Sequence, residues 1–174
     1  MHEGGISAPF IAWFPKQIKG GNIVKGTGHL IDLAPTFYEL ANTTYPVKLN
    51  GITTNPLPGK SLLPVLTGKS ETVDRGEPIF WERAGNRAVR KGNWKIVSTY
   101  PAYKWELYDL EKDRGENNDL SAVNTEIVNE LSADYFKWAD KTGVVDYEKI
   151  KPGNPNGTPA FGLEKGAARR GNVE

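Results

Sequence analysis

The second half of the chain carries the clearest pattern, in which short apolar runs precede one long amphipathic stretch. Runs rich in β-branched and aromatic residues predict strands at residues 79–82, 86–90, 94–98 and 104–110. Lys91-Gly92-Asn93, between the second and third runs, is a signal for a tight hairpin. Because all the connections are short, the pattern predicts a four-stranded antiparallel sheet.

A helix is predicted over residues 125–140, because apolar residues recur there at spacings of three and four. Lys141 and Gly143 are typical of a helix C-terminus. We expect the apolar stripe to cover one face of the sheet. The stripe consists of Ile127, Val128, Leu131, Tyr135 and Trp138. The following aromatic residues keep the same periods, which favours the core over a sugar-stacking surface: Trp94, Trp105, Tyr108 and Trp138.

The first half has weaker signals. Pro9 to Phe14 is a short apolar run, which predicts a buried strand. Residues 29–42 predict an amphipathic helix with Asp32 as its N-cap, and His29 is interpreted as structural. Residues 42–60 are rich in turn formers and predict a boundary or a long crossing loop.

Composition changes after Ile150, where glycine and proline become frequent and no periodicity remains. We interpret residues 151–174 as a Gly/Pro-rich tail, disordered or draped over a partner, in which Phe161 and Leu163 are the large apolar residues.

Charge and composition exclude several classes of protein. The net charge of +1 gives no electrostatic case for binding nucleic acid or an anionic membrane. No apolar run approaches the roughly 18 residues of a membrane span, and the first residues lack a signal-peptide pattern, so we expect a soluble chain. The absence of cysteine excludes disulfides, thiolate zinc sites and thiol nucleophiles. The two histidines lack metal-ligand spacing, and no phosphate-binding motif is present.

The chain opens with His2-Glu3-Gly4-Gly5-Ile6, in which paired glycines allow a close backbone approach and charged residues stand beside them. By itself this is also the pattern of a simple turn. With five later segments in the same order, however, it resembles the sulfatases of the alkaline phosphatase superfamily, and most closely their bacterial arylsulfatase-like branch. The six segments are HEGGISAPFIAWFP (2–15), GHLIDLAPT (28–36), GKSLLPVLTG (59–68), IFWE (79–82), GNRAVRKGNWKIV (85–97) and WELYDLEKDRGENNDL (105–120).

The resemblance implies an α/β fold class, with α+β character within this chain. Residues 1–58 would be the C-terminal remnant of the alkaline phosphatase-like α/β domain with its crossing loop. Residues 59–150 would be the C-terminal subdomain, an antiparallel sheet with a packed C-terminal helix. The tail, 151–174, would follow. Where relatives usually have Asp-Pro-Thr-Glu this chain has Asp113-Arg114-Gly115-Glu116, and we expect the fold to be unchanged there.

The resemblance also implies that the catalytic half lies before Met1. In the family, formylglycine made from the Cys or Ser of a C/S-x-P-x-R motif is the nucleophile, and Asp and Asn residues hold calcium. The segment at Ser7-Ala8-Pro9 lacks the arginine, since Ile11 stands there. We therefore expect this chain alone to bind neither cofactor and to show no turnover of the aryl or carbohydrate sulfate esters that a full-length sulfatase would hydrolyse.

Four residues are candidates for lining the substrate pocket of a full-length enzyme: His2, Glu3, Arg83 and Asn86. His2 and Glu3 would lie at the rim or floor of the site, with loop packing as the alternative. Arg83 and Ala84 replace a His and a Glu of relatives, so Arg83 either attracts an anionic substrate or is simply solvated.

A phosphodiesterase or phosphonate hydrolase of the same superfamily is an alternative. So is a non-catalytic module that binds a sulfated glycan or a protein. The partner expected for the full-length enzyme is a sulfated small molecule or glycan, and surfaces left exposed here would allow self-association. This chain by itself indicates no cellular location, and the resemblance is compatible with a full-length bacterial enzyme in the periplasm or outside the cell.

Overall fold

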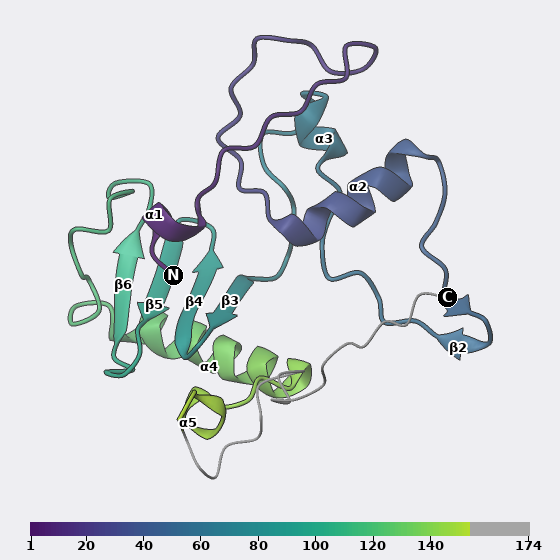
Figure 1. The fold of residues 1–174 in the computed structure, drawn as a ribbon. Coiled ribbons are helices and arrows are strands. Elements are labelled where there is room, and N and C mark those ends of the chain that lie inside the picture. Colours follow the sequence, from purple (N-terminus) through teal and green to yellow (C-terminus); the bar gives the residue numbers. More distant parts are fainter. Residues whose placement is uncertain (154–174) are drawn as a thin grey trace, which may run out of the picture. The chain divides into compact units, whose positions relative to one another are not determined.

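The computed structural model describes residues 1–153, and the chain divides into two compact units (Figure 1). The sheet unit contains residues 1–7 and the chain from Phe80 onward, and the loop unit contains Ala8–Ile79. The predicted domain limits of 1–58, 59–150 and 151–174 stay a prediction. Phe161 and Leu163 lie outside the described residues.

The sheet unit is built on the predicted four-stranded sheet, whose strand order is β3-β4-β5-β6. The strands are β3 (Ile79–Arg83), β4 (Asn86–Lys91), β5 (Trp94–Ser98) and β6 (Trp105–Asp109), which confirms the four predicted strands. β5 pairs antiparallel with both β4 and β6, and its Lys95 lies opposite Arg90 and Tyr108. Gly92, at φ +60°, makes the predicted hairpin between β4 and β5.

Helix α4 (Thr125–Thr142) covers one face of this sheet, as predicted (Figure 1). Its Leu131 and Tyr135 are buried with strand residues Val89, Ile96 and Leu107 in one cluster. The tryptophans of the predicted core pack around this cluster, and Gly143 ends the helix in the left-handed conformation at φ +72°. The short helix α5 (Tyr147–Ile150) follows.

The opposite face of the sheet carries a second apolar cluster, made of Ala88, Val97, Tyr108 and Leu110 with Met1 and Trp81 packed against it. Helix α1 (Glu3–Ile6) belongs to this face through contacts of Glu3 with Lys95. Successive strand residues point to opposite faces. Ile96 therefore faces α4, and its neighbour Lys95 faces α1.

The loop unit contains only short elements. They are η1 (Leu30–Asp32), α2 (Leu33–Leu40), β1 (Lys48–Leu49), β2 (Ile52–Thr53) and α3 (Leu63–Leu66). The predicted helix at 29–42 is confirmed as η1 followed by α2, and the turn-rich segment 42–60 contains the hairpin of β1 and β2. Within residues 1–153 no helix is long and apolar enough to cross a membrane.

The predicted buried strand at Pro9 to Phe14 is wrong. These residues form no strand, and the side chains of Ile11 and Trp13 are 88% and 85% exposed. A strand needs a neighbour for its backbone groups, and in the described chain this segment pairs with none. The apolar run is therefore present without the partner that its sequence pattern implied.

Asp32 does more than the predicted helix cap. It occupies the N-cap position of α2, but its carboxylate makes no cap hydrogen bond to that helix. Instead it forms a buried ion pair with Arg75, and it accepts hydrogen bonds from the backbone N–H groups of Lys60 at 2.9 Å and His29 at 2.7 Å. Although burial opposes ionisation, these donors hold the pKa of Asp32 below its usual range. Asp32 is thus the polar centre of the loop unit.

Candidate functional site

The four predicted pocket residues lie in the sheet unit as two separate pairs. His2 and Glu3 lie at α1, on the face of the sheet that is opposite α4. Arg83 and Asn86 flank the turn between β3 and β4. Among residues 1–153 no hydrogen bond or ion pair joins one pair to the other.

The His2 and Glu3 pair surrounds a buried lysine. The Nζ atom of Lys95 lies 2.8 Å from Oε1 of Glu3 and 2.8 Å from Oε1 of Glu116, and the lysine side chain is completely buried. A buried charge is destabilising unless it is paired, and here two carboxylates pair with one ammonium. We call His2, Glu3, Lys95 and Glu116 the Lys95 cluster.

Glu116 connects the cluster to α1. Its Oε2 atom accepts a hydrogen bond from the backbone N–H of Glu3 at 2.7 Å and lies 3.1 Å from Nδ1 of His2. Glu116 has φ +55°, an unusual conformation for a residue other than glycine. The preceding turn is held by Asp113, whose carboxylate accepts hydrogen bonds from the N–H groups of Asn117 and Asn118. Those hydrogen bonds, that of Asn118 first, keep the pKa of Asp113 below its usual range.

His2 is the member of the cluster that solvent reaches, since 42% of its side chain is exposed. Its Nε2 atom lies 3.8 Å from Oε2 of Glu106, and that carboxylate accepts a hydrogen bond from the Tyr108 hydroxyl at 2.9 Å. Burial, and then the hydrogen bond to Glu106, raise the pKa of Tyr108. Tyr108 therefore stays a neutral donor, and His2 is the member of the cluster that a ligand in solvent can reach.

In the second pair, the side chain of Asn86 is engaged in hydrogen bonds that hold the β3–β4 turn. The Asn86 side chain donates to the carbonyls of Arg83 at 3.1 Å and Ala84 at 3.3 Å, and its Oδ1 accepts from the N–H of Tyr100 at 3.2 Å. Both amide hydrogens and the amide oxygen are thus used to hold the turn. Arg83, which is exposed at the end of β3, is the member of this pair that can meet a ligand in solvent.

Sequence reasoning missed Lys95 and Glu116. The available signal for Lys95 was its position in a predicted strand beside the apolar residues Trp94, Ile96 and Val97, because a lysine that is buried there requires an anionic partner. Neither partner was recognisable from the sequence, because Glu3 is 92 positions away and Glu116 lies in a loop.

No group in the described part of the chain fits a metal ion, because no three His, Asp or Glu side chains come together in a suitable way. The Lys95 cluster does not fit calcium either, since the lysine ammonium occupies the space between its two carboxylates.

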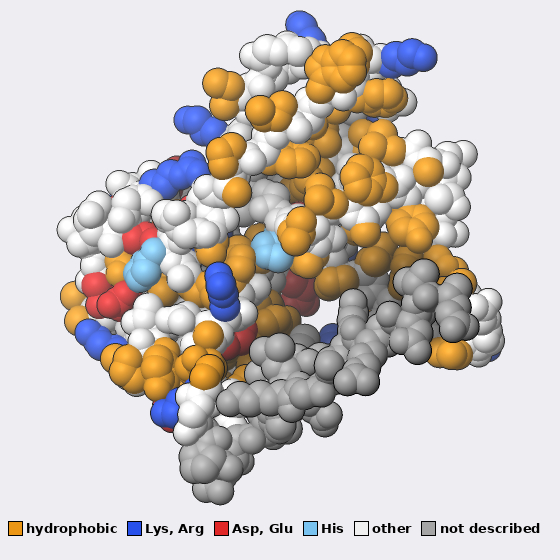
Figure 2. Space-filling view, viewed as in Figure 1, with side chains coloured by type: hydrophobic (Ala, Val, Ile, Leu, Met, Phe, Trp, Pro, Cys, Tyr) orange, Lys and Arg blue, Asp and Glu red, His pale blue; other side chains and the backbone are white. Residues whose placement is uncertain are grey.

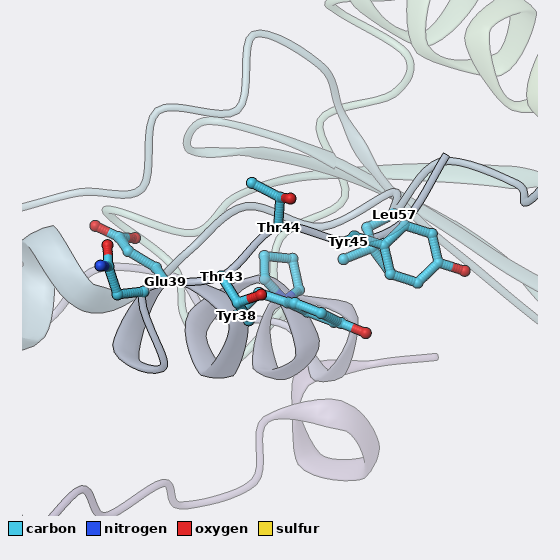
Figure 3. A pocket seen from close by; sticks show the side chains of 8 residues that line it. Tyr38, Glu39, Thr43, Thr44, Tyr45 and Leu57 are labelled. Carbon is cyan, nitrogen blue, oxygen red and sulfur yellow. The ribbon is translucent and has the colours of Figure 1, made fainter. Parts of the chain in front are cut away.

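A shallow hollow lies elsewhere, on the loop unit at the end of α2 (Figure 3). It has a volume of about 450 Å³, and the rings of Tyr38 and Tyr45 pack edge to face beside it, with centroids 5.5 Å apart. Its lining residues are Pro35, Tyr38, Glu39, Asn42, Thr43, Thr44, Tyr45 and Leu57. None of the four predicted pocket residues lies there.

Comparison with known proteins places the chain in a family. Residues 1–141 match the family model described as N-sulphoglucosamine sulphohydrolase, C-terminal. An uncharacterised sulfatase of Schizosaccharomyces pombe is 34% identical over 155 residues, which are 82% of this chain and 26% of the relative. The N-acetylgalactosamine-6-sulfatase of Mus musculus is 31% identical over 124 residues, 71% of this chain and 22% of the relative.

A solved structure gives the same answer for the fold. A Bacteroides thetaiotaomicron protein, described under the metabolism of multiple glycosaminoglycans, superposes with a TM-score of 0.57 at 25% identity. The match covers 74% of this chain and 28% of that one. The chain thus spans about a quarter of the length of the relatives it matches. Since the family model covers residues 1–141, the chain belongs to the sulfatase family and corresponds to the C-terminal region of its members.

Proposed function

We propose that this chain is the C-terminal region of a longer protein, and that the longer protein is a carbohydrate sulfatase that hydrolyses a sulfate ester. The observation that carries the proposal is the match of residues 1–141 to a model of the C-terminal region of a sulfatase. The mouse relative is named for an amino-sugar sulfate, and relatives come from eukaryotes as well as bacteria. These names favour a sulfated carbohydrate over an aryl sulfate, and they do not favour a bacterial branch.

We further propose that the chain has no turnover by itself. Sulfate ester hydrolysis needs a nucleophile at sulfur, a cation beside the sulfonyl oxygens and an acid for the leaving oxygen. The chain has no cysteine, and its described residues contain no group that fits a metal. The calcium and formylglycine of the family would belong to the part of the enzyme outside this chain.

The exposed surface of the loop unit supports a role as part of a larger fold. Fifteen large hydrophobic side chains are exposed in the described chain, and twelve of them belong to Ala8–Ile79. In the view of Figure 2, many hydrophobic side chains lie at the surface in the region of the loop unit. Soluble monomers rarely expose large apolar patches, and the exposure of these side chains supports a surface that the rest of the sulfatase covers.

Within the proposed enzyme, His2 and Arg83 are the candidates for meeting the substrate. The imidazole of His2 is accessible to solvent, and Arg83 presents a cation that attracts a sulfated ligand. Glu3 and Asn86, in contrast, are proposed to support these neighbours, because their side chains are engaged with Lys95 and with the β3–β4 turn.

The experiment compares the 174-residue chain with the product of the longest reading frame that contains it. Both are assayed with calcium on sulfated N-acetylhexosamines and on an aryl sulfate. We expect sulfate release by the longer product, faster on the sugar, and none by the chain alone. Enzyme-dependent release by the chain alone would contradict the proposal, as would a folded longer product without a nucleophile motif.

A further inference from the structure

We infer that Lys95 is a positioning residue: by binding Glu3 and Glu116 at once, it fixes α1, and with it His2, on the sheet. The effect on catalysis rests on the proposed function, whereas the effect on α1 concerns this chain alone. Lys95 is a buried charge that the apolar core of the sheet unit does not require.

The backbone of Lys95 is held in place by the sheet. β5 is hydrogen-bonded on both sides, to β4 and to β6, and Lys95 lies between Arg90 and Tyr108 across the sheet. Its ammonium meets one carboxylate from α1 and one from the loop after β6. The cluster therefore joins three parts of the chain that are far apart in the sequence.

The two carboxylates also support each other through the backbone. Glu116 accepts the N–H of Glu3 with the oxygen that Lys95 does not bind, so its carboxylate spans the lysine and the first residue of α1. Its side chain is only 3% exposed, and that of Glu3 is 11% exposed. Charge-assisted hydrogen bonds of this kind are stronger and more directional than neutral ones.

Removing the lysine charge would replace the attraction between Lys95 and the two carboxylates by repulsion between the carboxylates. Glu3 and Glu116 would then face each other as two buried carboxylates without the ammonium between them, and like charges in a low dielectric repel. Of the two, Glu3 lies on a helix of four residues, which has little stability of its own. We therefore expect α1 to leave the sheet.

The main core would survive this change. The cluster of Val89, Ile96, Leu107, Leu131 and Tyr135 lies on the other face of the sheet, against α4. In the described chain α1 is held by the Lys95 cluster, by the packing of Met1, and by a hydrogen bond from Arg114 to Ser7 at 3.1 Å. Lys95 thus determines the place of α1 without determining the fold of the sheet.

The test is hydrogen exchange on the whole chain, with Lys95→Met compared with wild type. The amides of Gly5 and Ser7 bond within α1, to the carbonyls of His2 and Glu3, both at 2.9 Å. We expect them to exchange at least about tenfold faster in the variant, whereas amides of β5 and α4 keep their rates. Unchanged exchange at Gly5 and Ser7 would overturn the inference.

Lys91→Met is the matched control, because it removes another strand lysine. Lys91 forms an ion pair with Glu130 in which both side chains are exposed. It should leave α1 exchange unchanged. If Lys95→Met fails to fold, the triple variant Glu3→Gln, Lys95→Met, Glu116→Gln removes the repulsion as well. We expect this triple variant to fold with a fast-exchanging α1, and protection equal to wild type would refute the positioning role.

A kinetic test separates positioning from stability in the longer product described above. At equal folded fraction, Lys95→Met should lower kcat about tenfold or more and leave KM within about threefold, and Lys95→Arg should restore part of the loss. If the unmodified longer product is inactive, the proposed function fails while the exchange test still stands. If it is active and Lys95→Met has wild-type kcat, the positioning role fails alone.

Discussion

The two units of this chain are stabilised in different ways. Among residues 1–153, nine of the twelve buried hydrophobic side chains belong to the sheet unit, and they form two clusters, one on each face of its sheet. The loop unit has three buried hydrophobic residues, and its interior also contains Asp32, whose side chain is completely buried. An apolar core tolerates separation from its surroundings, whereas a buried carboxylate depends on every donor around it.

The loop unit is also assembled from close backbone approaches. Gly59 packs against the carbonyl of Ile31 so tightly that a Cβ atom there would overlap it. This approach brings the N–H of Lys60 to Oδ1 of Asp32, at 2.9 Å. The contrast indicates that the sheet unit is organised around an apolar core, whereas the loop unit is organised around one polar centre and leaves twelve large apolar side chains exposed.

The largest expected effect is that of Asp32→Ala, which removes the polar centre of the loop unit. Breaking a buried ion pair leaves the Arg75 guanidinium uncompensated, at a cost of about 3–5 kcal/mol. Native-state hydrogen exchange should show lost protection in α2 and unchanged protection in β5. Asp74→Ala, at an exposed carboxylate of the same unit, is the control and should change little. Retained protection of α2 would disprove the contrast between the units.

A somewhat smaller effect is expected from Leu131→Ala in the sheet unit. Leu131 is a residue of α4, is 1% exposed and belongs to the cluster between α4 and the sheet. Truncation of such a leucine costs about 2–5 kcal/mol through lost burial and a cavity. Urea unfolding followed by far-UV circular dichroism measures the loss. Val123→Ala, at a side chain that is 78% exposed, should stay within about 0.5 kcal/mol. Equal effects of the two variants would contradict an apolar core at this position.

The smallest of the three expected effects is that of acid, which should lower the stability of the loop unit in two stages. Burial lowers the pKa of His29, so its neutral form contributes stability that is complete above about pH 6.5 and is lost as pH falls through the folded pKa. The pKa of Asp32 is also lowered, so its contribution is complete above about pH 4 and is lost further down.

Exchange of the α2 amides measured from pH 7 to pH 3 follows both stages. His29→Gln should remove the upper stage and keep the lower one. An upper stage that persists in His29→Gln would assign it to another group.

The periodic parts of the molecule were predictable from local patterns. The four strands, the hairpin at Gly92 and the helix α4 with its apolar stripe all appear where residue spacing indicated them. Pro9 to Phe14 failed because an apolar run reports only a tendency to be covered, and a strand also needs a neighbour with which to pair.

The candidate site was predictable only in part. His2 and Glu3 could be singled out because they stand beside two glycines, but Lys95 and Glu116 carry no comparable local mark. Similarly, Asp32 suggested a helix cap because its neighbours in the sequence are helical, while its main partner, Arg75, is 43 positions away.

Local spacing is therefore sufficient for the elements of this chain and for the face of α4 that is buried, because a helix or strand repeats its environment every few residues. The ordered segments even indicate the sulfatase family. Local spacing does not predict the partners of buried charges, because a salt bridge can join residues at any separation in the sequence. Only the tertiary structure brings Lys95 between Glu3 and Glu116, and that contact turns the opening residues from a loop into a fixed part of the sheet unit.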